Sequence, residues 1–327
     1  MSALQRRIAA GLVALAGLAV GAAMAQGFPA KDRPIRMLVG FAAGGGTDIQ
    51  ARQLAPKLAD AIGTSIVIEN RPGASTMIAA QAVAQAPPDG YTILYTFNGT
   101  MAQNPHVFNK VAYDPFKDFT PISLGARGSQ LLVMHKSLPA ANLKEAMAYA
   151  KANPGQVSIA SFGVGTSSHI FGELLKRQAG VDIIHVPFKG TGDAAKDLLA
   201  GRVQLMFDAA TSAMQNVGTG RLVPVGIVAD KRSPLLPDVP TLTEQGYKGI
   251  DQVGWLAFYG PAKMPAEIVA KLNAAIVKAL AHPEIKEAFA RGIYEAVSST
   301  PEELAAMTRS SYDTWGRIIK EVGIQPQ

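Results

Sequence analysis

Short apolar segments alternate with helical patterns along most of this sequence, and that alternation restricts the fold more than any other feature. Residues 35–39, 66–68 and 91–95 have the composition of buried strands. Between them, residues 51–62 and 77–86 repeat apolar side chains at helical spacing. A chain that repeats strand, helix and strand forms a parallel sheet covered by helices. We therefore expect an α/β unit in the N-terminal part.

The alternation resumes after a stretch that contains Pro105, Pro115 and Pro121. The predicted strands here are residues 131–134, 157–160, 183–186, 203–207 and 222–227, and the predicted helices are residues 143–152, 169–179 and 194–199. This pattern indicates a second α/β unit.

The C-terminal part contains a strand near residues 255–259 and two long helices, residues 265–281 and 301–322. Thr300 and Glu303 have the spacing of a capping box. The first unit has too few helices of its own to cover both faces of its sheet, so we expect the chain to return to it. Domain 1 is then residues 26–127 plus 251–327, and domain 2 is residues 128–250. The two crossings, near residues 125–129 and 246–253, predict a hinge.

The N-terminus has the pattern of a secretory signal peptide, residues 1–25. Arg6 and Arg7 precede an apolar stretch that ends in the small-residue triplet Ala23-Met24-Ala25. A permanent membrane anchor is the alternative, and the cleavable triplet favours a signal. We expect cleavage after Ala25 and a mature protein outside the cytoplasm, in the periplasm.

The composition excludes several classes of protein. The chain has 327 residues, of which 48% are hydrophobic and 17% charged, so a disordered protein is excluded. Its formal charge is +6, and +4 once Arg6 and Arg7 are removed. No run of Lys and Arg interleaved with aromatic residues occurs, which argues against nucleic-acid binding. The absence of cysteine excludes disulfides, thiolate zinc sites and cysteine nucleophiles.

A glycine-rich loop follows the first predicted strand and reads Phe41-Ala42-Ala43-Gly44-Gly45-Gly46-Thr47-Asp48. Glycines let backbone amides approach a ligand, and the helix that follows has a positive N-terminal end, which favours carboxylate or phosphate. The alternative is a turn capped by Thr47 or Asp48, because Asp48 would satisfy the same amides and repel an anion.

Similar loops follow three other predicted strands, at residues 70–76, 97–100 and 161–169. Each contains hydroxyl, amide or glycine residues. Loops of this kind at the carboxyl ends of strands in two facing domains predict a cleft for a small polar ligand.

Familiar catalytic and cofactor motifs are incomplete. Residues 165–169 have His169 where a hydrolase elbow needs glycine, and no Walker lysine follows the triple glycine. Residues 190–195 match the dinucleotide pattern G-x-G-x-x-A, and Asp208 lies near the distance expected for a ribose contact. However, Pro187-Phe188-Lys189 intervenes between strand and glycines, and the predicted export argues further against a dinucleotide. We expect no cofactor.

The five histidines, His106, His135, His169, His185 and His282, show no metal-ligand spacing. His169 either packs under the neighbouring loop or donates to a ligand. Asp208 either caps the following helix or accepts a hydrogen bond from a ligand hydroxyl or ammonium.

Six segments, in this order, carry a resemblance to a known family: residues 41–52 (FAAGGGTDIQAR), 69–74 (ENRPGA), 88–94 (PDGYTIL), 165–175 (GTSSHIFGELL), 186–208 (VPFKGTGDAAKDLLAGRVQLMFD) and 231–246 (KRSPLLPDVPTLTEQG). Through them the chain resembles the periplasmic solute-binding receptors of tripartite tricarboxylate transporters, the Bug receptors, over essentially its whole mature length.

The resemblance implies an α/β two-domain periplasmic binding protein of the second structural type, with a mixed sheet flanked by helices in each domain. It implies a monomer that closes on a small organic acid and delivers it to membrane permease subunits. The ligand-binding residues that it implies are Phe41, Gly45, Gly46, Thr47, Asp48, Ser75, Thr76, Gly165, Thr166, Ser167, Ser168, His169 and Asp208. Phe41 would form a wall, Asp208 would accept, and the others would donate through backbone or hydroxyl groups.

Two departures from the family pattern affect the site. Ala42 replaces a usual proline, and Ser75 and Thr76 replace two usual glycines. The two side chains either narrow the pocket or supply hydroxyls in place of a bridging water.

The sequence leaves the solute and two other functions open. The solute is a di- or tricarboxylate, an amino acid or an aromatic acid. An exported hydrolase using Ser167 and His169 is one alternative, although a serine and a histidine two residues apart do not form a nucleophile–base pair by that spacing. A receptor that feeds a signalling sensor is the other.

Overall fold

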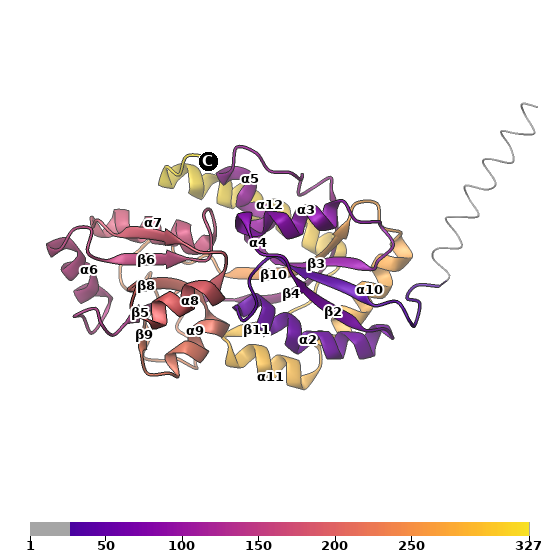
Figure 1. Ribbon diagram of the computed structural model, residues 1–327, viewed down its shortest axis with the longest axis horizontal. Coiled ribbons are helices and arrows are strands. Elements are labelled where there is room, and N and C mark those ends of the chain that lie inside the picture. Colours follow the sequence, from indigo (N-terminus) through magenta and orange to yellow (C-terminus); the bar gives the residue numbers. More distant parts are fainter. Residues whose placement is uncertain (1–26, 327) are drawn as a thin grey trace, which may run out of the picture.

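The structure is a computed structural model that describes residues 27–326, so the predicted signal peptide lies outside the described residues. The described chain folds into two α/β units that lie side by side (Figure 1). Among its helices, none combines the length and the apolar character that crossing a bilayer requires.

The first unit is built on a six-stranded mixed sheet with the order β11-β4-β10-β3-β1-β2. Its strands are β1 (Ile35–Val39), β2 (Ile66–Asn70), β3 (Thr92–Phe97), β4 (Phe119–Gly128), β10 (Gly254–Pro261) and β11 (Tyr294–Ala296). Strands β1, β2 and β3 are parallel, whereas β10 runs antiparallel to both β3 and β4. The sheet therefore combines strands from the two ends of the chain: β1 to β4 come from the N-terminal part, and β10 and β11 from the C-terminal part.

The second unit is built on a five-stranded mixed sheet with the order β7-β6-β8-β5-β9. Its strands are β5 (Gln130–His135), β6 (Ser158–Ser161), β7 (Ile184–Pro187), β8 (Leu205–Ala209) and β9 (Leu222–Ile227). Strand β6 is parallel to β7 and β8, and β5 is antiparallel to β8 and β9. The carboxyl ends of β6 and β8 thus lie on one edge of this sheet.

Helices cover both faces of each sheet, because successive residues of the central strands β3 and β5 are buried and side chains on both faces need cover. The first unit contains α2 (Gly46–Ile62), η1 (Ala74–Thr76), α3 (Met77–Ala84), α4 (Asn98–Ala102), α5 (Asn104–Val107), α10 (Ala266–Leu280), α11 (Pro283–Arg291) and α12 (Pro301–Val322). The second contains α6 (Leu143–Ala152), α7 (Ser167–Ala179), α8 (Thr191–Leu199) and α9 (Ala210–Val217).

The buried side chains divide among three clusters. Helices α2, α10 and α11 cover one face of the first sheet, and α3, α4 and the start of α12 cover the other. In the second unit α6 and α7 cover one face, and α8 and α9 the other. One of these clusters is continuous between the units, because it joins Phe41 of the first to Phe162 of the second. The two-domain α/β fold with mixed, helix-flanked sheets is confirmed.

Three segments connect the units. Strand β4 continues into β5 through Ser129, and residues 228–253 return from β9 to β10. Helix α12 starts on the first unit and ends on the second, where Trp315 packs 5.7 Å from Phe171 between ring centroids. Figure 1 shows this helix spanning both units along one side.

Most predicted elements coincide with observed ones, and α6, β9 and α12 have the predicted bounds. Strand β4 was not predicted, because Pro121 lies inside it, and β11 was not predicted, because it has only three residues. Helices α9 and α11, which are short, were not predicted either. The missed β11 matters for function, since it carries Tyr294 into the space between the units.

The capping box at the start of α12 provides a test of this helix. Thr300 Oγ1 accepts the Glu303 N–H at 3.1 Å, and the Glu303 carboxylate accepts the Thr300 N–H at 2.9 Å. Thr300→Ala should lower the free energy of unfolding by about 1 kcal/mol, because it removes the cap. Chemical denaturation measures the change. Thr314→Ala, which removes the same atoms inside the same helix, is the matched control and should cause no comparable loss.

Candidate functional site

A small cavity of about 40 Å³ lies between the two units, and four of its lining residues, Asn98, Gly128, Trp255 and Tyr294, also border a larger groove. It is lined from the first unit by Phe41, Thr47, Phe97, Asn98, Gly128, Gly254, Trp255, Leu256 and Tyr294, and from the second by Gln130, Phe162, Ser167, Thr191 and Ala209. One buried water needs roughly 10–15 Å³, so the cavity has room for only a few. The two units are therefore in close contact around this cavity, and a solute of several carbon atoms fits into it only if they separate.

Four helices of eight or more residues begin at this cavity. Thr47 is the second residue of α2, Ser167 and Thr191 are the first residues of α7 and α8, and Ala209 directly precedes α9. All four residues line the cavity. The first N–H groups of a helix have no partner within the helix, and the helix dipole adds partial positive charge there. The cavity is thus surrounded by neutral groups that favour an anion.

Two hydroxyl groups in the lining accept hydrogen bonds from neighbours. Gln130 Nε2 donates to Ser167 Oγ at 2.5 Å, and the Gly46 N–H donates to Thr191 Oγ1 at 3.1 Å. A serine or threonine oxygen that accepts one hydrogen bond keeps its own O–H available as a donor. Ser167 and Thr191 are therefore arranged to donate into the cavity.

Aromatic rings form the other part of the lining. The ring centroid of Phe41 lies 5.1 Å from that of Phe97 and 5.8 Å from that of Phe162. Trp255 and Tyr294 add two larger rings. No Lys, Arg, Asp, Glu or His contributes to this lining among the described residues. The cavity therefore combines neutral donors with an apolar wall.

The loops that flank the cavity interlock closely. A Cβ on Gly45 would lie 2.5 Å from Thr191 Oγ1, and one on Gly192 would lie 2.9 Å from the Ala43 carbonyl oxygen. Glycine is required at both positions for this approach. Across the interface, Ser75 Oγ donates to the Val164 carbonyl oxygen at 2.5 Å.

The loop that departs from the family pattern is strained. Ala74, Ser75 and Thr76 have φ values of 45°, 50° and 75°, which side chains other than glycine rarely adopt. Two local hydrogen bonds stabilise this strained conformation. Asn104 Nδ2 donates to the Ser75 carbonyl at 2.7 Å, and the hydroxyl groups of Thr76 and Thr100 lie 2.6 Å apart. Ser75 thus contacts the opposite unit, whereas Thr76 stays inside its own.

Of the predicted ligand-binding residues, Phe41, Thr47 and Ser167 line the cavity, and Gly45 and Gly46 contact Thr191 beside it. Asp48 points away from it. Its carboxylate accepts hydrogen bonds from Arg52, Asn70 and the Gly44 N–H. Burial opposes ionisation of Asp48, but these hydrogen bonds together lower its pKa.

Three residues in the loop before α7 and at its start, Gly165, Thr166 and Ser168, lie behind the cavity. Thr166 Oγ1 donates to the Gly163 carbonyl at 2.7 Å, and Ser168 Oγ donates to the Phe207 carbonyl at 2.7 Å. The Gly165 N–H donates to His169 Nδ1 at 3.1 Å. The hydroxyl groups of Thr166 and Ser168 thus bond inside the second unit and do not line the cavity.

His169 lies beside the loop rather than in the cavity. Its ring stacks on His185 with 4.1 Å between centroids. Burial lowers the pKa of His169, and burial together with His169 lowers the pKa of His185 to about 3. The imidazole of His169 thus contacts Gly165 and His185, and it does not bond to Ser167.

Asp208 is fully buried in the second unit and does not line the cavity. Ser212 Oγ donates to its Oδ2 at 2.5 Å, and its Oδ1 has no partner among the described residues. Burial raises the pKa of Asp208 to about 7, although the hydrogen bonds from Ser212 and the Ala209 N–H lower it. Asp208 thus bonds to the Ser212 side chain within α9, and it does not cap the helix, whose N-cap residue is Ala209.

Four lining residues, Gln130, Phe162, Thr191 and Tyr294, were not predicted as site residues. Thr191 lies in the segment that matches the dinucleotide pattern, and its position at the start of a helix was the available signal. Gln130 begins a strand directly after a crossing between the units, and such positions face the gap. Nothing in the sequence marks Tyr294.

The buried carboxyl of Asp208 makes a pH-dependent prediction. An unfolded Asp titrates near 4 and Asp208 near 7, so the folded protein holds an extra proton between these values. Its contribution to stability is complete below pH 4 and is lost as the pH rises through 7, by at most about 1.4 kcal/mol per pH unit. Asp208→Asn should remove this loss.

Urea denaturation of wild type and variant at pH 4 to 8 measures the difference. The variant should become progressively more stable than wild type as the pH rises. Asp193→Asn, at a partly exposed carboxylate paired with Lys196, is the control. Parallel stability profiles for wild type and Asp208→Asn would contradict the prediction.

Comparisons with known proteins agree on the class of this protein. Residues 50–324 match the family described as tripartite tricarboxylate transporter family receptor. The solved structure of the periplasmic binding protein BugD is 35% identical, with a TM-score of 0.87, over 90% of this chain and 99% of that one.

Two further solved structures contain a ligand. R. palustris Rpa4515 with adipate is 32% identical, with a TM-score of 0.87, over 92% of this chain and 100% of that chain. MatC from Rhodopseudomonas palustris with bound malate is 34% identical, with a TM-score of 0.84, over 89% and 100%. This family consists of solute-binding receptors, not enzymes. The chain belongs to the tripartite tricarboxylate transporter receptor family, the Bug family of periplasmic solute-binding proteins.

Proposed function

We propose that this protein binds a small carboxylated solute between its two units in the periplasm and delivers it to the membrane permease of a tripartite tricarboxylate transporter. One observation supports this most: four helices begin at a cavity that has hydroxyl donors and no charged side chain in its described lining. A carboxylate is a small anion whose two oxygens accept several such hydrogen bonds at once, and the relatives favour it over other small anions.

The relatives provide a second line of support. Structures that share about a third of their residues with this chain contain adipate and malate, both of which are carboxylates. We therefore place the carboxylate of the solute near Ser167 and Thr191 and its carbon skeleton near Phe41 and Phe162.

Closure follows from the same geometry. The donors come from both units, so a bound anion stabilises the closed arrangement over the open one. The Ser75–Val164 hydrogen bond across the interface adds to that preference. The closed protein is then the form that the permease recognises.

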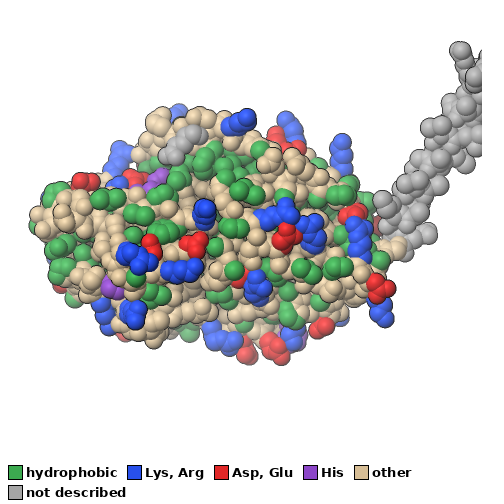
Figure 2. All heavy atoms as spheres, in the orientation of Figure 1, with side chains coloured by type: hydrophobic (Ala, Val, Ile, Leu, Met, Phe, Trp, Pro, Cys, Tyr) green, Lys and Arg blue, Asp and Glu red, His purple; other side chains and the backbone are tan. Residues whose placement is uncertain are grey.

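The surface is consistent with a small-molecule receptor. On the face in Figure 2, lysine and arginine side chains are interspersed with aspartate and glutamate and do not gather into one basic stripe. Nucleic acid is therefore a poor partner for this face.

The geometry and the family both argue against the exported hydrolase. Ser167 Oγ accepts its hydrogen bond from Gln130, and His169 Nδ1 accepts one from the Gly165 N–H. A nucleophile–base pair requires a direct hydrogen bond between serine and histidine. These two side chains have different partners.

Isothermal titration against di- and tricarboxylates, amino acids and aromatic acids tests the proposal. For the tightest ligand, Ser167→Ala should weaken binding by about tenfold to about a hundredfold, because a hydrogen bond to a charged group is lost and Gln130 Nε2 loses its acceptor. Ser168→Ala is the matched control. Its hydroxyl bonds to Phe207 behind the site, so this variant should lose stability but retain affinity. Binding of uncharged solutes alone would contradict the proposal.

A further inference from the structure

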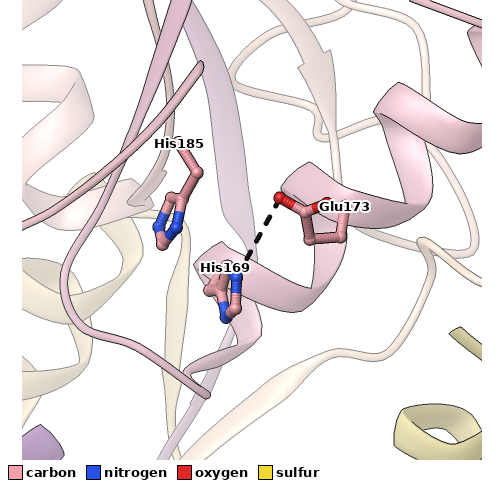
Figure 3. Close-up of side chains that lie close together, drawn as sticks. All are labelled: His169, Glu173 and His185. Atoms are coloured by element: carbon pink, nitrogen blue, oxygen red, sulfur yellow. Dashed lines mark ion pairs between the residues drawn. The ribbon is translucent and has the colours of Figure 1, made fainter. Parts of the chain in front are cut away.

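A cluster of metal-ligating side chains lies outside the cavity, on α7 and β7 of the second unit. His169 and Glu173 are one turn apart on α7, and His185 lies beside them on β7 (Figure 3). One ligand atom from each side chain lies within 4.8 Å of those of the other two. Ligand atoms around a tetrahedral zinc ion are about 3.3 Å apart, because each bond is about 2.0–2.1 Å long. Small side-chain rotations therefore bring all three onto one ion.

We propose that His169, Glu173 and His185 bind a zinc ion and that the bound ion releases the loop of residues 163–166 from its closed position. Two imidazoles and one carboxylate are ligands that zinc prefers. The proposal does not depend on the proposed function, because none of the three residues lines the cavity.

His185 is oriented for this role by Ser161. Ser161 Oγ lies 2.7 Å from His185 Nε2 and donates to the Gly163 carbonyl at 3.2 Å. In the tautomer that carries its proton on Nε2, His185 donates to Ser161, whose hydroxyl donates in turn to the Gly163 carbonyl. The lone pair of His185 Nδ1 is then free. Such an outer partner is what fixes the tautomer of a metal-binding histidine.

Glu173 is accessible to an ion from solvent. It lies with His169 and Lys176 in an open groove, and its side chain is 28% exposed. Lys176 Nζ lies 2.9 and 3.1 Å from its two carboxylate oxygens and competes with a cation for them. Lys176 must therefore move away when the ion binds.

His169 is the one residue of the proposed zinc site that also bonds to the loop of residues 163–166. Its Nε2 faces Glu173, with 4.0 Å between Nε2 and Oε1, while its Nδ1 accepts the Gly165 N–H. A neutral imidazole that binds zinc through Nε2 carries its proton on Nδ1. That proton would face the Gly165 N–H, and two donors repel each other. Zinc binding thus displaces the Gly165 peptide and, with it, the Val164 carbonyl that Ser75 contacts across the interface.

Titration of zinc chloride into the untagged protein, expressed from the full-length sequence, tests the site. Wild type should bind one zinc ion. Glu173→Gln and His185→Gln should each weaken binding by at least about tenfold, and Lys176→Gln should strengthen it. His135→Gln is the matched control, because it removes another imidazole of the same unit, one that contacts Ser137. The control should bind zinc as wild type does.

Hydrogen exchange of the Gly165 amide tests the coupling. Zinc should accelerate exchange at Gly165 in wild type but not in Glu173→Gln. Absence of saturable zinc binding, or equal affinity in wild type and both ligand variants, would overturn the site. Unchanged exchange at Gly165 in the zinc-loaded wild type would overturn the release of the loop.

Discussion

Convergence of helix N-termini on one gap is the constraint on which the rest of this structure depends. Helices α2, α7, α8 and α9 begin at the cavity, and they come from both units. Their partial positive charges and free N–H groups repel one another unless an anion or a polar group lies between them. These neutral donors attract an anion at little desolvation cost of their own, whereas a buried Lys or Arg would lose several kcal/mol of hydration.

Close approach of the two units requires small residues at the interface. Gly45 and Gly192 let backbones meet where any Cβ would collide with the opposite unit. The Ala74–Thr76 turn differs from these glycine positions, because its residues carry side chains at positive φ values that glycine adopts without strain. Its strain is of order 1–3 kcal/mol per residue and is offset by hydrogen bonds, one of which joins the units. The side chain of Ser75 thus strains the loop but provides a hydrogen bond to Val164 that favours closure of the two units.

The strand and helix patterns predicted the two units, and the loops at strand ends supplied three of the residues that line the cavity, Phe41, Thr47 and Ser167. The sequence did not predict Tyr294, which reaches the cavity from a three-residue strand paired with β4. Such a strand has no periodicity to detect. It also could not decide how Asp48 and His169 point, since their partners Asn70 and His185 are distant in the sequence.

The most direct test of the central claim compares a carboxylate solute with its own primary amide, which has nearly the same shape and no charge. The acid that binds most tightly and its amide are titrated under identical conditions by calorimetry. If the neutral donors and helix ends around the cavity hold a carboxylate, the acid should bind at least about a hundredfold more tightly than the amide. Equal affinities would contradict the account, because shape and apolar contact would then suffice for binding.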